Sequence, residues 1–560
     1  MPDSIGAAAS PLESHLLKHP LIAGVAEDAN QRRQRRFALV LPPMPEERAF
    51  SNAWLVLPGK FPEERARIQL SRDAILRVPH VDSSGDLCFS GEAGPASGAT
   101  AEARLDRLLA LFQEEFLVPW LTGKLDCDFE KETANYWTIH VNRYASDVDA
   151  VKRVYTLDVR PTEPRLLDGQ LLQPSRTLIV GDNLPLASRL IASLGPRATQ
   201  VATVIVADIP VDFPFTPRTW PAQLTDILSL LQSRLNDVQY RAFERASHAR
   251  ATHRLVLLRA PTCTYGYLLP GGPPTVVVKG KTKRAYPTGQ LLPLLVERVD
   301  PGWTCGRDQH AQVGARQRSH VLVLGAGALG SVVIDTLARS GVGRITVVDP
   351  DFLSASNIGR HLLGADMLGL PKAQGIAAHV GRAVPSCQLD YSREDAEAWL
   401  MRATLSGVDI VLDITGEPDV RAALETARLL HPRPLVISWM EPYVAAAHVC
   451  VLKDTEHWLA GLPDRLIDLQ AVDWPDDVIM QEPGCSSQFQ SYTPAQATFA
   501  VALVAEAALA LIDRQVAASH LRSWVRGQSF LDAHYPGLVL REWAHSATKL
   551  DGVLLCRPWP

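Results

Sequence analysis

The stretch HVLVLGAGALGSVVIDTLARSGVGRITVVDPDFLSASNIGRHLLGADMLGLPK, from His320 to Lys372, decides the fold of the C-terminal half of the chain. An apolar run, Val321 to Leu324, leads into a glycine-rich turn, a helical segment and a second β-rich run that ends at Asp349. Glycines in such a turn let a phosphate approach backbone N–H groups at a helix start, where the dipole favours negative charge. The order predicts a Rossmann-like nucleotide site whose acid hydrogen-bonds a ribose. Its glycines are Gly325, Gly327 and Gly330.

The residues after the acid distinguish this site from one for NAD or FAD. Two fixed cations and an amide follow within one short segment, together with a second acid: Asp351, Asn357, Arg360 and Lys372. A dinucleotide site holds its diphosphate without breaking it. A site that cleaves ATP needs positive charge where the leaving pyrophosphate becomes more negative. The segment therefore favours cleavage of ATP.

The spacing D-P-D-x5-N-x2-R, followed by G-L-P-K, resembles the adenylation domain of ubiquitin-activating enzymes and their bacterial sulfur-carrier relatives, the ThiF type. The resemblance implies that ATP and Mg²⁺ bind here and that Asp349 holds the ribose. Asn357, Arg360 and Lys372 would contact the phosphates, and Asp351 belongs to the same motif. The structural alternative is a decayed Rossmann unit with surface Arg and Lys.

The segment VDIVLDITGEPDVR resembles the acidic strand end with which this family helps to hold Mg-ATP, and Asp413 fits the first acid. Where many relatives carry a second Asp, this chain has Gly416, followed by Glu417 and Asp419. Because Mg²⁺ is held by few carboxylates together with the substrate phosphates, Asp413 alone can suffice. The alternative role for Asp413 is a helix N-cap after the strand.

Composition indicates an ordinary soluble protein of about three domains, with 560 residues, 46% hydrophobic and 21% charged. A net charge of −5 gives no electrostatic reason to expect nucleic acid. The longest apolar stretch, Ala497 to Ile512, is interrupted by Glu506 and predicts a buried helix rather than a membrane span. The N-terminus does not resemble a signal peptide. Eight cysteines without a C-x-x-C pair argue against disulfides and zinc, so we expect a cytoplasmic protein.

A second informative region lies near the N-terminus. The segment Ala53 to Gln69 predicts two strands joined by a Pro/Gly turn, and a helical pattern runs from Leu105 to Phe116. A turn-rich loop between them bears Cys88. This order resembles ubiquitin-conjugating enzymes, whose His-Pro-Asn and Gly-x-Ile/Leu-Cys motifs align without gaps on Val78-Pro79-His80 and Gly85-Asp86-Leu87-Cys88.

The resemblance implies that Cys88 carries a thioester. A thiolate on an exposed loop can exchange acyl groups, whereas a buried thiol is inert. His80 replaces the Asn that steadies the oxyanion in the family, and an imidazole N–H can donate the same hydrogen bond. The alternative is that Cys88 is a small core residue next to Leu87 and Phe89.

A third region, QEPGCSSQFQSYT from Gln481 to Thr493, predicts a polar loop ahead of the apolar helix. Cys485 lies in it between Gly484 and Ser486, small neighbours that leave the sulfur accessible. Activating enzymes that form a thioester carry their catalytic Cys on a loop near the adenylate, so the resemblance implies that role for Cys485. The alternative is a surface thiol without a function.

Arg307 lies just ahead of the nucleotide domain. Relatives often carry an Arg-rich helix here that reaches into the ATP site of the other subunit, where Arg307 could neutralise the leaving pyrophosphate. A surface Arg before a strand is the alternative. The middle of the chain, roughly residues 160 to 300, alternates short β-rich runs with one helical pattern from Ala222 to Leu235 and carries no catalytic motif.

We therefore expect a multidomain α/β protein. Residues 1–160 would form an α+β ubiquitin-conjugating-like domain and residues 161–300 a mixed α/β linker domain. Residues 301–560 would form a Rossmann-like, doubly wound adenylation domain that carries the loop of the catalytic Cys. Such a fusion resembles the bacterial ubiquitin-transferase-like proteins of CBASS antiphage operons, which attach the C-terminus of a cyclic-nucleotide synthase (a CD-NTase) to other proteins.

This resemblance implies adenylation of a protein C-terminus, a relay from Cys485 to Cys88, transfer to a lysine of an acceptor protein, and a homodimer, with no nucleic-acid or membrane partner. Two rivals remain. A sulfur-carrier adenylyltransferase would use the same nucleotide site without Cys88, although the missing C-x-x-C pairs oppose its usual zinc-bearing form. A non-catalytic adaptor would bind a nucleotide and a protein tail as a switch.

Overall fold

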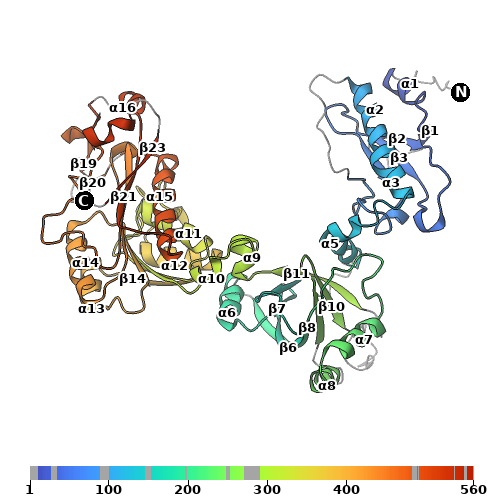
Figure 1. Cartoon of the computed structure of the whole chain (residues 1–560), viewed down its shortest axis with the longest axis horizontal. Coiled ribbons are helices and arrows are strands. Elements are labelled where there is room, and N and C mark those ends of the chain that lie inside the picture. Colours follow the sequence, from blue (N-terminus) through green and yellow to red (C-terminus); the bar gives the residue numbers. More distant parts are fainter. Residues whose placement is uncertain are drawn as a thin grey trace. The chain divides into compact units, whose positions relative to one another are not determined.

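The computed structural model describes residues 11–26, 34–88, 100–144, 153–195, 198–246, 253–269, 291–481, 488–489, 491–534, 537–547 and 552–558. They form two compact units. Figure 1 labels their helices and strands. The first comprises Met1–Thr156, Arg160–Asp182 and Thr199–Glu297, and the second comprises Leu157–Val159, Asn183–Ala198 and Arg298–Pro560. The three-domain division expected from the sequence is finer than these two units.

The first unit begins with an antiparallel sheet in the order β1-β2-β3-β4, formed by Ile22–Ala26, Arg35–Leu39, Ala53–Leu57 and Arg67–Leu70. The strands predicted within Ala53 to Gln69 are confirmed as β3 and β4. One face of the sheet is apolar and fully buried, with Phe37, Leu55 and Ile68 at its centre.

A long helical segment covers this apolar face. It runs through α2 (Ala101–Leu111), the wider helical turn η3 (Phe112–Leu117) and α3 (Val118–Leu121), and the side chain of Thr100 caps its start. Leu105, Leu109 and Phe112 recur at helical spacing and are buried against the sheet, which confirms the predicted helix. We call this sheet, its covering helices and three further helices, all within residues 11–144, the N-terminal module. The further helices are α1 (Pro11–Leu16), α4 (Asp128–Lys131) and α5 (Thr133–Tyr144).

The middle of the chain forms a closed barrel accompanied by helices. The strands and helices of the expected mixed α/β domain are therefore present, whereas the closure of the sheet was not predicted. Its strands run in the order β10-β11-β5-β7-β6-β8-β9. Trp137 of α5 packs on the barrel and donates from Nε1 to the carbonyl of Leu294 (2.9 Å). The strands are Arg153–Thr156, Arg165–Gln173, Thr177–Val180, Thr199–Pro210, His253–Arg259, Thr264–Leu269 and Leu292–Arg298, β5 to β11, and α7 (Leu224–Arg234) and α8 (Asp237–Arg245) connect β8 to β9.

The second unit is built on an eight-stranded sheet in the order β14-β13-β12-β15-β16-β17-β21-β23. The five strands from β14 to β16 are parallel, and the last three run antiparallel to their neighbours. The strands are β12 (His320–Leu324), β13 (Arg344–Val348), β14 (Gln388–Ser392), β15 (Ile410–Asp413), β16 (Leu435–Met440), β17 (Ala446–Leu452), β21 (His520–Val525) and β23 (Val553–Pro558).

Helices cover both faces of the parallel part, as the predicted doubly wound domain requires. Val333, Ile376 and Val504 bring α11 (Ala328–Arg339), α12 (Lys372–Ala383) and α15 (Pro494–Ile512) onto one face. Leu400 and Leu424 bring α13 (Ala396–Arg402) and α14 (Pro418–Leu430) onto the other. Smaller elements are α6 (Leu184–Ser193), α9 (Pro301–Gly306), α10 (Val313–Arg316), α16 (Gln528–His534), and the strand pairs β18 (Val472–Asp473) with β22 (Val539–Leu540) and β19 (Met480–Gln481) with β20 (Gln488–Phe489).

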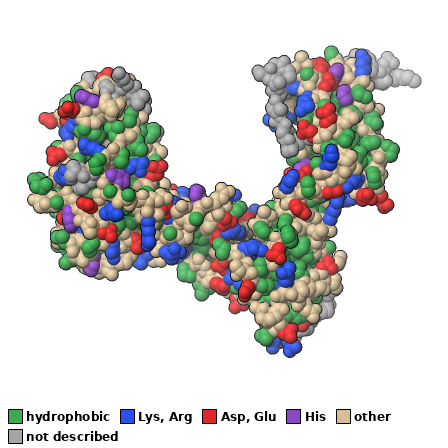
Figure 2. Space-filling model, in the orientation of Figure 1, with side chains coloured by type: hydrophobic (Ala, Val, Ile, Leu, Met, Phe, Trp, Pro, Cys, Tyr) green, Lys and Arg blue, Asp and Glu red, His purple; other side chains and the backbone are tan. Residues whose placement is uncertain are grey.

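Helix α15 is long and apolar enough to cross a membrane by length and composition alone. Ala500, Val504 and Ala508 on one side of this helix are nevertheless part of the core beneath the sheet. This burial agrees with the prediction of a core helix. On the face shown in Figure 2, the Lys and Arg side chains among the described residues are interspersed with Asp and Glu.

Gly330 sets how closely α11 packs on the turn before it. A Cβ added at Gly330 would lie 2.1 Å from the carbonyl oxygen of Gly325. A Cβ added at Gly327 would meet nothing within 4 Å, although the same motif supplies both glycines. Of these two positions, only Gly330 has no room for a Cβ atom.

Gly330→Ala should therefore destabilise the second unit, by about 1–3 kcal/mol, because the helix must move away from the turn. Gly327→Ala is the matched control; it replaces a glycine N-cap without a clash, so its cost should stay at about 0.5–1 kcal/mol. Thermal unfolding of the full chain, followed by circular dichroism, measures both. Equal losses of stability in the two variants would contradict this packing argument.

Candidate functional site

The carboxyl ends of three neighbouring strands meet at one edge of the second sheet. Leu324 at the end of β12 pairs with Val348 of β13 on one side and with Asp413 of β15 on the other. The chain leaves β12 to opposite sides for β13 and β15, so the strand order reverses here. This is the position at which open α/β sheets bind their ligands. The glycine-rich turn predicted from the sequence lies at this edge.

Asp349 follows β13 and binds the backbone of that turn. Its Oδ2 accepts from the N–H of Ala326 (2.6 Å), and its Oδ1 accepts from the N–H of Asp351 (2.9 Å). Burial raises the pKa of the Asp349 carboxyl above its usual range. Each carboxylate oxygen can accept more than one hydrogen bond. The predicted bond to a ribose is therefore compatible with a second role, that of holding the turn.

His361 binds the carbonyl of the same residue, Ala326, and the sequence did not identify it. Its Nδ1 accepts from the N–H of Leu363 (3.0 Å), so Nε2 carries the proton and donates to the carbonyl oxygen of Ala326 (2.7 Å). Burial lowers the pKa of His361, which favours the neutral form that this geometry needs. In the sequence, only its position directly after Arg360 could have indicated that His361 belongs to the site.

Lys372 opens α12 at this edge, and its side chain is only 10% exposed. Its Nζ donates to Oδ2 of Asp351 (2.8 Å), and its backbone N–H donates to the carbonyl of the same residue (2.8 Å). The structure thus brings together two of the predicted residues. A mostly buried ammonium whose carboxylate partner is 66% exposed can exchange that partner for a phosphate.

The other two polar residues of the motif make different contacts. The guanidinium of Arg360 lies over the ring of Tyr492, 4.9 Å from its centroid, just before α15. This tyrosine was not identified from the sequence. The Oδ1 of Asn357 accepts from both the N–H and the Oγ of Ser354, at 3.0 and 2.9 Å. Asn357 therefore shapes the loop in this conformation, and its contact with a phosphate stays a prediction.

Asp413 ends β15 and is fully buried. Its Oδ1 accepts from the N–H and Oγ of Thr415, at 3.0 and 2.6 Å, whereas Oδ2 has no hydrogen-bond partner among the described residues. The alternative helix-capping role is wrong, because the N-cap of α14 is Glu417. A buried carboxylate oxygen without a donor fits a ligand of Mg²⁺. Gly416 adopts a φ of 78°, which favours glycine over the Asp of relatives.

Arg421 links this carboxylate to a distant segment of the same unit. Its side chain is 3% exposed, and Nη1 lies 4.0 Å from Oδ2 of Asp413, just beyond hydrogen-bond distance. Its Nε donates to Oδ2 of Asp464 at 2.7 Å. The other oxygen of Asp464 accepts from the indole of Trp458 (3.1 Å). One buried guanidinium therefore ties the strand end to the segment that follows β17.

Cys88 lies on the rim of the N-terminal sheet, and its side chain is exposed. The turn before it is held by backbone bonds, in which Leu70 donates to Gly85 and Leu87 donates to Ile68. The N–H of Cys88 itself donates to the carbonyl of His80 (2.8 Å). The alternative of a buried core residue is therefore wrong, and the side chain is exposed on a turn held by backbone hydrogen bonds.

The ring of His80 is engaged elsewhere. Nδ1 lies 3.0 Å from Glu132 and Nε2 lies 3.1 Å from Asp128, while the backbone N–H donates to Tyr136 Oη (3.0 Å). Burial alone would raise the pKa of Asp128, but hydrogen bonds from Lys131 and His80 hold it below its usual range. The predicted donation from this ring to an oxyanion would require it to leave these carboxylates.

The remaining predicted site residues are Cys485 and Arg307. Cys485 lies outside the described residues. Arg307 ends α9 with a left-handed φ of 50° and is exposed, with its guanidinium 5.0 Å from the ring centroid of Trp303. Its finger role stays a prediction.

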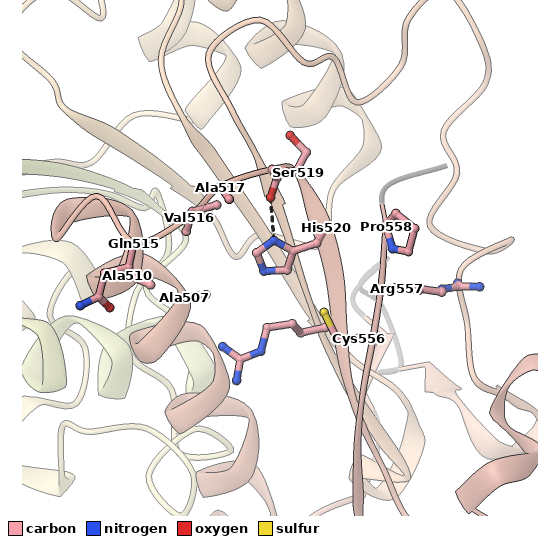
Figure 3. A pocket seen from close by; sticks show the side chains of 12 residues that line it. Ala507, Ala510, Gln515, Val516, Ala517, Ser519, His520, Cys556, Arg557 and Pro558 are labelled. Atoms are coloured by element: carbon pink, nitrogen blue, oxygen red, sulfur yellow. Dashed lines mark hydrogen bonds between the residues drawn. The ribbon is translucent and has the colours of Figure 1, made fainter.

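A separate hollow of about 530 Å³ lies between the C-terminal end of α15 and strands β21 and β23 (Figure 3). His520 lies in it and bonds through Nδ1 to the carbonyl of Ala518 (2.9 Å), and Cys556 lines the same wall. Helix α15 has 19 residues and is therefore about 28 Å long. Because Tyr492, beside Arg360, precedes its other end, the hollow is remote from the glycine-rich turn.

Residues 309–508 match the ThiF family. The chain is 25% identical over 345 residues to the "ATP-dependent ubiquitin transferase-like protein Cap2" of Pseudomonas aeruginosa, which covers 59% of this chain and 62% of that protein. A protein of the same name from Enterobacter hormaechei is 32% identical over 106 residues, 19% of this chain and 18% of that protein. The "Adenylyltransferase and sulfurtransferase UBA4" of Yarrowia lipolytica is 34% identical over 116 residues, 21% of this chain and 29% of that protein.

The chain thus spans less than two thirds of the length of these relatives. The prediction of a Rossmann-like adenylation domain of the ThiF type in the C-terminal part is confirmed. The similarity to Cap2 extends over 345 residues, well beyond the 309–508 match, and supports the predicted resemblance to fusion proteins of that kind.

Replacement of His361 by Gln should weaken the second unit in a pH-dependent way. In the unfolded chain His361 takes up a proton near its ordinary pKa of about 6.5, whereas its pKa in the folded chain is lowered. Its stabilising contribution is therefore complete above that ordinary pKa and is lost as pH falls through the lower, folded value.

At pH 7.5 we expect a loss of about 1–3 kcal/mol, because a Gln amide placed to donate to the carbonyl of Ala326 does not also accept from the N–H of Leu363, as the ring of His361 does. The difference in unfolding temperature between the native and H361Q chains should shrink as the pH is lowered below about 6.5. His310→Gln, at an exposed position of the same unit, controls for other titrations. A difference in unfolding temperature that stays constant from pH 7.5 to 5 would contradict the proposed contribution of neutral His361 to stability.

Proposed function

We propose that this protein activates the C-terminal carboxylate of a partner protein with ATP and transfers it, through two thioesters, to an amine. The observation that carries the proposal is the buried Oδ2 of Asp413, at the same strand edge as the glycine-rich turn. This oxygen accepts no hydrogen bond from the described residues, and its ion-pair partner Arg421 lies 4.0 Å away. A desolvated carboxylate oxygen without a donor is costly unless a cation or donor meets it. A ThiF-family match over the same residues supports ATP as the ligand.

The first step would take place at the glycine-rich turn. A carboxylate oxygen of the donor tail attacks the α-phosphorus of ATP, and pyrophosphate leaves, so that an acyl-adenylate remains. Lys372 and Arg360 would hold the phosphates as their charge grows. Mg²⁺, held by Asp413 and the phosphates, would supply further positive charge. Asp349 would orient the ribose while it keeps the turn in place.

The next steps would move the acyl group along the chain. The thiolate of Cys485 attacks the acyl carbon and AMP leaves. The thiolate of Cys88 then attacks that thioester and frees Cys485, and finally a lysine amine attacks and frees Cys88. Each step breaks one bond to the acyl carbon and forms one, so no oxidant or reductant is needed. The exposure of Cys88 on a fixed turn supports its place in this order.

The partners of the reaction follow from the same resemblance. The donor would be the C-terminal tail of a CD-NTase, the acceptor a lysine-bearing protein, and the setting an antiphage operon in the cytoplasm. Arg307 would reach the nucleotide site of a second subunit in a homodimer. A sulfur-carrier adenylyltransferase would share the first step only, and the match to UBA4 covers 21% of this chain.

Lys372→Ala and Arg360→Ala should each lower ATP–pyrophosphate exchange by about 10²- to 10³-fold, because each removes a cation from the phosphates. Arg382→Ala is the matched control, since this exposed arginine lies on the last turn of the same helix as Lys372. The assay uses a panel of proteins encoded beside this chain, with intact or truncated tails. Absence of exchange with every tail would favour the non-catalytic adaptor.

Cys88→Ser should abolish a thiol-sensitive adduct on the N-terminal module, and Cys485→Ser should abolish it too, because the relay passes through both. Cys127→Ser, another exposed cysteine of that module, should leave it unchanged. Gels without reductant, loaded after incubation with ATP and the donor that supports exchange, report the adduct. Its persistence on Cys88 in the Cys485→Ser protein would reverse or remove the two-cysteine order.

A further inference from the structure

A cavity of about 570 Å³ lies on the N-terminal module, on the side of the sheet away from the covering helices. Three arginines from separate elements converge on it: Arg36 of β2, Arg72 after β4, and Arg143 near the end of α5. Its volume falls in the range of small-molecule sites. Its other lining residues are Trp54, Gln69, Leu70, Ser71, Ile75, Ser83 and Ser84, and none of the lining residues is acidic.

The carboxylates nearest in sequence have other partners. Asp86 accepts from Gln69 Nε2 (3.0 Å) and pairs with Arg67 Nε (2.9 Å). Asp82 accepts from the N–H and Oγ of Ser84, at 2.8 and 2.7 Å. Asp73 accepts from the N–H and Oγ of Ser51, both at 2.9 Å. Among the described residues, no ion pair joins a carboxylate to Arg36, Arg72 or Arg143.

One of the three arginines is held in place by neutral groups. Arg36 donates from Nη2 to Gln69 Oε1 (2.8 Å), and its guanidinium lies 5.6 Å from the ring centroid of Trp54. Gln69 is itself fixed, because its Nε2 donates to the carbonyl of Ser84 (3.0 Å). The positive charge of Arg36 is therefore oriented at the cavity without being neutralised there.

Three like charges around one hollow repel one another, and an anion between them removes that repulsion. Guanidinium forks match the paired oxygens of a phosphate in both charge and geometry. We propose that this cavity binds the diphosphate group of a small molecule, either free pyrophosphate or a nucleoside diphosphate. Trp54 offers a ring face for the base in the second case.

The position of the cavity links it to the turn that carries Cys88. Ser83 and Ser84 line the cavity, and the same turn continues through Gly85, whose carbonyl accepts from the N–H of Leu70 (2.8 Å). A bound diphosphate would therefore touch the turn four to five residues ahead of the thiol. The site itself is independent of the proposed thioester chemistry.

The test uses the full chain with both Lys372 and Arg360 replaced by Ala, so that the site at the glycine-rich turn does not dominate. Pyrophosphate is titrated into this protein by calorimetry at low salt. We expect one saturable site per chain that weakens as salt is raised. Arg72→Glu and Arg143→Glu should each weaken binding about tenfold or more, as expected for loss of a charge-assisted bond.

Arg77→Glu is the matched control, because this arginine is exposed on the same module and does not line the cavity. It should change binding by less than about twofold. Arg72 and Arg143 are also exposed, so their replacement should not lower the unfolding temperature, which checks the fold of each variant.

The same titration with ADP separates the two sources. Tighter binding of ADP than of pyrophosphate, lost in Trp54→Ala, assigns a nucleoside diphosphate, and equal affinities assign free pyrophosphate. Absence of saturable binding of either probe would overturn the proposal. So would an Arg77→Glu effect as large as that of Arg72→Glu, or equally tight binding of hexaglutamate, which would make the site a peptide contact.

Discussion

The backbone of Ala326 is bonded through both its N–H and its carbonyl, and the geometry of the nucleotide edge depends on these two bonds. Asp349 accepts from its N–H, and His361 donates to its carbonyl. Two side chains from the segment after β13 thereby fix the turn after β12, and the absence of a side chain at Gly330 lets the helix start close against that turn. Preorganised N–H groups stabilise developing negative charge without reorganising when that charge appears. The turn is held before any ligand arrives.

Buried charge at this edge has an energetic cost that the protein compensates only in part. Burial raises the pKa of Asp413, and the nearby guanidinium of Arg421 does not reach hydrogen-bond distance. Arg421 instead bonds to Asp464, whose second oxygen holds the indole of Trp458. A cation beside Oδ2 would stabilise the ionised form of Asp413. The guanidinium of Arg421, 4.0 Å from that carboxylate and hydrogen-bonded to Asp464, therefore lies between the strand end and the segment beyond β17.

The local sequence pattern was enough to predict the elements whose conformation depends on residues close together in the sequence. The glycine-rich turn, the strands β3 and β4 and the helix through Leu105 follow from spacing alone. The barrel did not, because closure requires pairing between strands far apart, such as β5 with β7 and β8 with β9. His361 and Tyr492 were missed for a related reason. A lone His or Tyr signals nothing until the fold brings it to Ala326 or Arg360.

In the N-terminal module, the turn that carries the exposed thiol of Cys88 is held by hydrogen bonds to its surroundings. His80 adopts a left-handed φ of 61°, a conformation that costs free energy for a residue other than glycine. Its backbone and ring compensate by bonding to Tyr136, Glu132 and Asp128 on the following helices. The carbonyl of His80 is left to accept from the N–H of Cys88. His80 thus connects the helices to the turn that carries Cys88. These contacts give His80 a structural role that does not depend on any part in acyl transfer.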